Sequence, residues 1–116
     1  MATRNHTRTP TSTSKAFVAA WTGLLQGDEG DSLPFSQYTD KSVQVTGTFG
    51  GATLRVEGSN NGTDWAVLTD PQGNDLLITS AKVEMVTEAT LYTRPKISGG
   101  DGTTSLAVHM LCKEAS

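Results

Sequence analysis

The segment 58–65 (GSNNGTDW) lies between two runs in which apolar and polar residues alternate. The first run, residues 52–57, places Leu54 and Val56 on one face, and the second run, residues 64–69, leads back from the turn. Asn61-Gly62 is a pair that readily supplies the positive φ angles of short hairpin turns. We therefore predict a tight β-hairpin here, which constrains the chain to a β architecture.

Similar short alternating segments recur along the 116 residues, separated by turn residues at roughly 8–12-residue intervals. This spacing is typical of a sandwich of antiparallel strands. We predict one all-β domain over residues 15–116, an antiparallel, jelly-roll-like β-sandwich of about eight strands, with an immunoglobulin-like sandwich as the alternative. The predicted core contains Trp21, Val43, Val45, Leu54, Val56, Leu68, Leu106, Val108 and Met110, with Cys112 in phase with the last three.

The segment 90–97 is predicted to be a strand with Leu91 and Ile97 on its inner face. Tyr92, Arg94 and Lys96 then share the opposite face. Pro95 lacks a backbone N–H, so we expect this strand at a sheet edge or with a bulge.

Residues 1–14 form a segment of different composition, with five threonines and no large apolar residue after Met1. Such a segment buries too little surface to offset its ordering entropy. We expect an extended N-terminal arm that contact with another chain would order. Arg4, Arg8 and Lys15 are the only charged residues before Asp28, and we predict that they contact acidic side chains of a protein partner. This basic charge is too small to favour sequence-specific binding of nucleic acid.

The residue types that catalysis or metal binding would need are scarce. His6 and His109 are the only histidines, Cys112 is the single cysteine, and no zinc-site spacing or nucleophile–base motif is present. The segment 26–31 (QGDEGD) matches no calcium-loop spacing, and we predict that it is a solvated acidic loop. We predict no enzyme activity, no metal and no cofactor. No run of 18 apolar residues is present, so we expect no membrane contact. The single cysteine allows no disulfide within the chain, so we expect synthesis in a reducing cytoplasm.

Trp65, Tyr92 and Arg94 carry an alternative hypothesis. Aromatic ring faces and guanidinium groups are used in carbohydrate recognition. If the three side chains gather at one end of the sandwich, they would form a glycan-binding site.

The stretch 57–65 (EGSNNGTDW), with 91–94 (LYTR) downstream, resembles the G-S-N-D-G-x-x-W hairpin and Y-x-R strand of discoidin-type, galactose-binding-like jelly rolls. Asn61 stands where aspartate is commoner. This resemblance implies a jelly-roll fold, while members of the class bind glycans, lipids or proteins through variable loops.

The body from 21–24 (WTGL) to 99–106 (GGDGTTSL), including 45–52 (VTGTFGGA), resembles small structural proteins of tailed phages. Some of these serve as capsid decoration, or cement, proteins. The resemblance implies a virion protein on the capsid surface that binds the major capsid protein, self-associates as a dimer or trimer and stabilises the shell. A tail or baseplate component is the alternative location.

Overall fold

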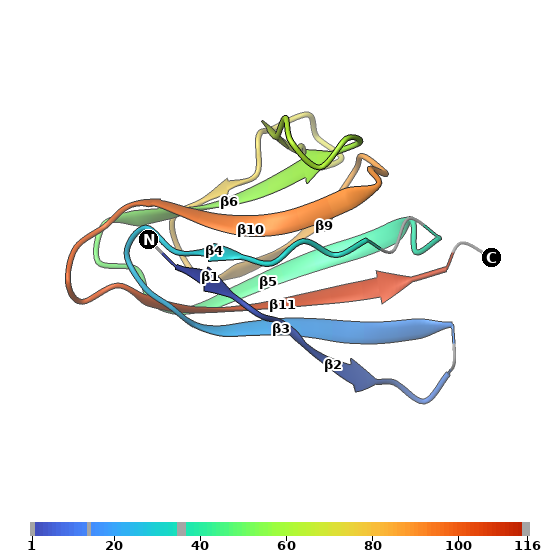
Figure 1. Cartoon of the computed structure of the whole chain (residues 1–116), viewed down its shortest axis with the longest axis horizontal. Helices are drawn as coiled ribbons and strands as arrows, with labels where there is room; N and C mark the ends of the chain where they lie inside the picture. The colour runs from blue at the N-terminus through green and yellow to red at the C-terminus, as the bar shows by residue number, and fades with distance from the viewer. Residues whose placement is uncertain (1, 14, 35–36, 115–116) are drawn as a thin grey trace.

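The computed structural model describes residues 2–13, 15–34 and 37–114. These residues form two β-sheets that face one another across the core (Figure 1). The six-stranded sheet has the order β1 (Thr3–Arg4), β4 (Glu29–Gly30), β10 (Tyr92–Gly99), β6 (Ala52–Ser59) and β7 (Ala66–Val67), with β8 (Leu77–Ile78) also paired to β6. The five-stranded sheet has the order β2 (Thr7–Pro10), β3 (Ala16–Leu24), β11 (Ser105–Lys113), β5 (Asp40–Thr48) and β9 (Lys82–Val86).

The prediction of an all-β sandwich is confirmed, but the described residues contain eleven strands instead of about eight. Four of the eleven, β1, β4, β7 and β8, are two residues long. A pair of residues carries no alternation, so strands this short leave no periodic signal in the sequence.

The core lies between the sheets and is formed by every second residue of the long strands. All nine predicted core residues are buried, and so is Cys112. Side chains alternate between the two faces of a strand, so each polar residue between two core residues points to the outside of the sandwich. Trp21 is the largest fully buried side chain among the described residues.

The predicted hairpin forms between β6 and β7, but it is not a tight one. The main partner of β6 is β10, which pairs with it over eight residues, while β7 pairs only at Glu57 and Gly58. A six-residue loop, 60–65, joins β6 to Ala66. Gly62 has a φ of +77°, but no described residue other than glycine has a positive φ, so Asn61 does not contribute one. Instead, its side-chain Oδ1 accepts hydrogen bonds from the backbone N–H groups of Thr63 and Asp64.

The outward positions predicted on β10, Tyr92, Arg94 and Lys96, alternate as expected with buried Thr93, Pro95 and Ile97. Leu91 was predicted to face inward, but it precedes the strand and is 40% exposed.

Pro95 does not place β10 at an edge, because β10 lies between β4 and β6. On the β4 side, pairing is confined to Lys96 with Glu29 and a bridge between Thr93 and Leu33. Close packing on this side also explains why position 30 is a glycine. A Cβ there would lie 2.6 Å from the Trp21 indole nitrogen and 2.7 Å from the Pro95 ring.

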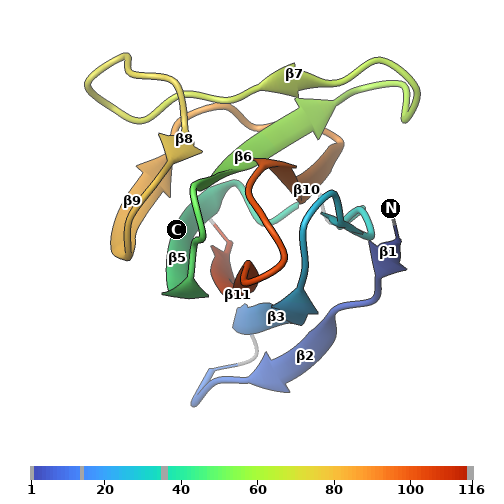
Figure 2. The same cartoon turned by 90° about the vertical axis from the view of Figure 1, so that its left-hand side faces the viewer.

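The N-terminal segment is extended, as predicted, but it lies on its own chain. β1 pairs in parallel with β4, and β2 pairs antiparallel with β3, so the segment crosses from one sheet to the other along one side of the sandwich (Figure 2). The expectation that only another chain could order this arm is therefore wrong for residues 2–13. Backbone pairing within the molecule supplies the contacts that its composition lacks.

Candidate functional site

The outer face of the five-stranded sheet is free of charge over most of its length. Paired residues on the five strands form two rows across it: Thr9, Val18, Leu111, Ser42 and Met85, and then Thr7, Ala20, His109, Gln44 and Val83. Ala107 and Thr46 continue the same face. We call these twelve residues the five-strand face; none of them is Asp, Glu, Lys or Arg, although such residues make up 18% of the chain.

Apolar side chains are exposed at one side of the five-strand face. Val83 is 60% exposed, Met85 51% and Leu111 38%. A hollow of about 460 Å³ adjoins them, bounded by the turn at Pro71 and Gln72 and, at the strand ends, by Asp40, Lys41, Glu84 and Lys113. The outer face of an antiparallel sandwich sheet is usually polar because it faces water. Exposed apolar patches of this kind mark surfaces that contact other molecules in many proteins.

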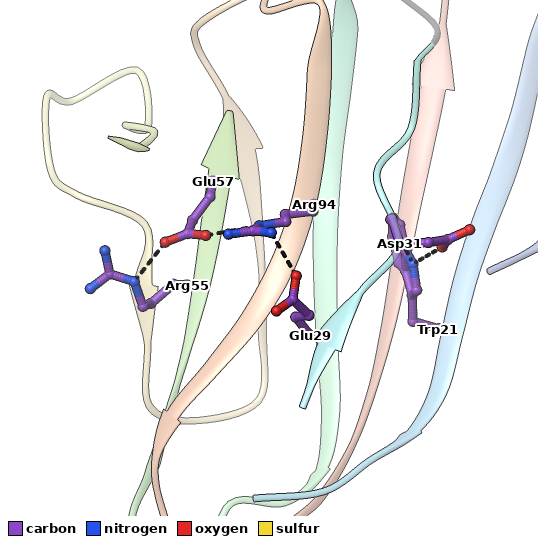
Figure 3. A network of polar contacts seen from close by, with 6 residues as sticks. All are labelled: Trp21, Glu29, Asp31, Arg55, Glu57 and Arg94. Carbon is purple, nitrogen blue, oxygen red and sulfur yellow. Dashed lines mark hydrogen bonds and ion pairs between the residues drawn. The ribbon is translucent and has the colours of Figure 1, made fainter. Parts of the chain in front are cut away.

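The outer face of the six-stranded sheet is built differently. Arg94 Nη1 donates to Glu29 Oε2 at 2.6 Å and Arg94 Nε donates to Glu57 Oε1 at 3.0 Å (Figure 3). Arg55 Nε donates to the second oxygen of Glu57 at 3.1 Å. Glu57 is buried, so its carboxylate depends on the two guanidinium groups for solvation. These four residues carry no net charge together, and their fixed geometry stabilises the sheet.

The residues of the glycan hypothesis do lie on one surface. The Trp65 ring covers the Arg94 guanidinium, whose Cζ lies 4.0 Å from the ring centroid. Tyr92 is the preceding outward residue on β10, and its ring lies beside Gly62. Arg94 places one face of its guanidinium against Trp65 and donates two of its five N–H groups to Glu29 and Glu57. Binding of a glycan here stays a prediction.

The basic residues of the arm also have contacts within the chain. Arg4 Nε donates to Asp28 Oδ2 at 2.9 Å, and the Arg8 guanidinium lies 4.2 Å from the Phe17 ring centroid. Lys15 is exposed at the start of β3. The prediction that these three residues bind a partner stays a prediction, and Arg4 already donates its Nε–H to Asp28.

Two aspartates that the sequence placed in a solvated loop hold the arm. Burial acts to raise the pKa of Asp28, but hydrogen bonds from Leu25 N–H, Arg4 and Ala2 N–H outweigh it and hold that pKa below its usual range. Asp31 accepts from the His6 backbone N–H at 2.9 Å and from Trp21 Nε1 at 2.8 Å. The composition of the loop alone gave no sign of this role.

No group of three or more His, Cys, Asp or Glu side chains among the described residues is arranged to hold a metal ion. His109 lies in the five-strand face between Ala20 and Gln44. Burial raises the pKa of the Cys112 thiol to about 11 despite the nearby Lys41 and Arg8, so little thiolate forms near neutral pH. Within the same part of the chain, no helix is long and apolar enough to cross a membrane.

The sequence analysis missed the five-strand face, although the signal was present. The positions between the core residues of 43–45 and 106–112 are Gln44, Ala107, His109 and Leu111, none of which is Asp, Glu, Lys or Arg. An alternating pattern identifies the outward set as surely as the inward one. The contribution of Val83 and Met85 required the pairing of β9 with β5.

No protein-family model matches this sequence, and no curated protein does. Among solved structures, the SPBc2 prophage-derived protein YomS is similar, with a TM-score of 0.63 and 12% identity over 89% of this chain and 98% of that one. A cupin domain from Bordetella pertussis Tohama I is similar at a TM-score of 0.51, with 14% identity over 100% of this chain and 99% of that one. At these identities the likeness shows a shared β-sandwich fold over nearly the whole chain.

Proposed function

We propose that this chain is a structural protein of a phage virion, without enzyme activity, that binds the major capsid protein as a capsid decoration (cement) protein. The five-strand face carries the proposal. The fold likeness to a prophage-derived protein and the sequence resemblance to small phage structural proteins support it. The likeness to a cupin domain supports a jelly-roll-like arrangement of the strands, which belongs to the same proposal.

The two outer faces would then have different tasks. The charged face around Glu57 and Arg94 faces water, where paired charges keep the surface soluble. The five-strand face lies on the shell, where removal of Val83, Met85 and Leu111 from water favours attachment. Each single contact is modest, and repetition over a symmetric shell adds avidity.

The arm has a smaller part in this proposal than its composition suggested. β2 is the edge strand of the five-stranded sheet, so Arg8 and Lys15 lie near the rim of the five-strand face. They are suited to contact acidic side chains of the capsid protein around an uncharged centre. Arg4 belongs to the other sheet through β1 and is held by Asp28.

The test measures how much purified protein sediments with shells that lack it. Ala20→Lys and Ala20→Glu each place a charge in the five-strand face, and both are expected to reduce the bound copies at least about tenfold, because a charge of either sign must be desolvated. Thr53→Lys, on the outer face of the six-stranded sheet, is the matched control and should bind normally. Equal binding by all three variants would contradict attachment through this face.

A tail or baseplate position and a glycan-binding role are the alternatives. Cryo-electron microscopy of the intact particle distinguishes capsid from tail. A change in tryptophan fluorescence on addition of simple sugars, lost in Arg94→Ala, would favour the surface at Trp65 and Tyr92 instead.

A further inference from the structure

The strand β9 is an edge strand with features that favour pairing to another strand. Its only neighbour in the five-stranded sheet is β5, among the residues that the structure describes. It has no proline or glycine and its pairing with β5 runs without a bulge. Natural edge strands are usually protected by such irregularities, because their unpaired backbone groups can extend the sheet into a second molecule.

We propose that β9 pairs antiparallel with β9 of a second copy of this chain, about a twofold axis at Val83. Residues directly opposite in an antiparallel pair point to the same side, so the axis must pass through a residue. With the axis at Val83, Lys82 lies opposite the partner's Glu84, and the same ion pair forms a second time by symmetry.

Other registers are less favourable. An axis at Glu84 would place two glutamates directly opposite each other, which is destabilising. An axis at Met85 would place Glu84 opposite an apolar residue, Val86, and would leave Lys82 outside the paired region. Charge complementarity within the sequence 82–86 (KVEMV) therefore selects Val83.

The surroundings of β9 agree with this register. Lys82 Nζ already lies 3.8 Å from Glu84 Oε1 in the single chain, so both groups are in position to exchange partners. The segment that follows β7 is hydrogen-bonded to the chain just after the C-terminal end of β9, where Thr87 N–H donates to Thr69 O. A contact centred on Val83 uses the half of the edge nearer to Lys82.

The pairing would join two five-stranded sheets and make their five-strand faces continuous. Val83, the most exposed of the large apolar residues described, would then lie against its symmetry mate. This inference does not depend on the proposed attachment to a capsid, because it concerns the chain alone. The interface is small, so the dimer is weak in solution and becomes populated at the high local concentration on a particle.

The test uses single cysteine variants under mild oxidation, since the native Cys112 is buried. Val83→Cys should form a disulfide-linked dimer at least about tenfold faster than Met85→Cys. Leu77→Cys, exposed on β8 in the other sheet, measures random collision. A Val83→Cys rate no higher than that of Leu77→Cys would overturn the proposal.

Charge exchange tests the register itself. In the Val83→Cys background, Glu84→Lys places two lysines opposite each other at both ends of the pair and should slow cross-linking about tenfold. Adding Lys82→Glu restores opposite charges and should restore the rate. If the double variant stays as slow as the single one, the register is refuted. Ala20→Lys, three strands away, should cross-link normally even where it no longer binds shells, which separates this proposal from the proposed function.

Discussion

The carboxylate of Asp31 accepts a hydrogen bond of 2.8 Å from the indole Nε1–H of Trp21, at the boundary between the core and the N-terminal segment. The same oxygen accepts the His6 backbone N–H, and His6 Nδ1 lies 2.9 Å from it. One side chain therefore satisfies the polar atom of the largest core residue and fixes the segment between β1 and β2. The buried tryptophan and the surface arm are linked through a residue that the sequence placed in a loop.

Replacing Asp31 by alanine should loosen this link. We expect Asp31→Ala to lower the free energy of unfolding by about 1–3 kcal/mol, because the Trp21 indole N–H keeps only the longer contact to the Asp31 backbone oxygen. Urea denaturation followed by tryptophan fluorescence measures the change. Faster amide hydrogen exchange at His6, with no change in β10, would locate the effect in the arm. An unchanged urea midpoint would contradict the prediction.

Replacing Glu57 by alanine should cost more than breaking an exposed ion pair. Glu57 is buried and neutralises Arg94 and Arg55, so its loss leaves a largely buried guanidinium with one carboxylate partner. We expect Glu57→Ala to reduce the free energy of unfolding by about 2–4 kcal/mol. Glu84→Gln removes the exposed ion pair with Lys82 and should change the free energy of unfolding by less than about 1 kcal/mol. A similar loss of free energy of unfolding in both variants would show that the burial of Glu57 does not determine the strength of its ion pairs.

Acid should destabilise the fold through two carboxylates with lowered pKa values. Hydrogen bonds from the Thr69 hydroxyl and N–H lower the pKa of Glu88, and the contacts described above lower that of Asp28. A carboxyl whose pKa is lower in the folded state contributes its full stabilisation above the unfolded value of about 4, and this is lost as pH falls through the folded value. Thermal unfolding between pH 7 and pH 2 should show this loss, and Asp28→Asn with Glu88→Gln should flatten the profile. A wild-type curve without slope below pH 4 would contradict the assignment.

Much of the core could be predicted from the sequence, because burial on a long strand follows a period of two and needs no knowledge of the partner strand. Trp21, Val43 and Met110 were identified in this way. The position of the arm could not be predicted, because β1 and β2 acquire their partners only when distant segments meet. Asp28 likewise resembles any solvated loop residue until Arg4 is placed beside it.

The loop 60–65 depends on glycine at one position. Gly62 has a φ of +77°, and a Cβ there would lie 3.3 Å from the Tyr92 ring. We expect Gly62→Ala to reduce the free energy of unfolding by about 1–2 kcal/mol. Gly102→Ala is the matched control, since that glycine has an ordinary φ and open space, and it should be neutral. Asn61→Val should act differently, through the loss of hydrogen bonds to Thr63 and Asp64.

Removal of residues 2–10 tests whether the arm is part of the fold or a free clamp. In the structure, the deletion removes Arg4 from Asp28 and His6 from Asp31, and it exposes the edge of β3 from Phe17 to Ala20, which β2 covers. The truncated chain should unfold at a lower urea concentration, with a free energy of unfolding reduced by at least about 2 kcal/mol, because Asp28 and Asp31 lose the donors that the arm supplies.

The uncovered edge should also make this variant aggregate, which light scattering detects. The matched control is Arg8→Ala in the full-length chain, which keeps the backbone pairing of β2 and should not aggregate. If truncation instead left the stability and solubility unchanged, the arm would merely rest on the sandwich. It would then be free to leave its own chain and bind a neighbouring one, as its composition suggested.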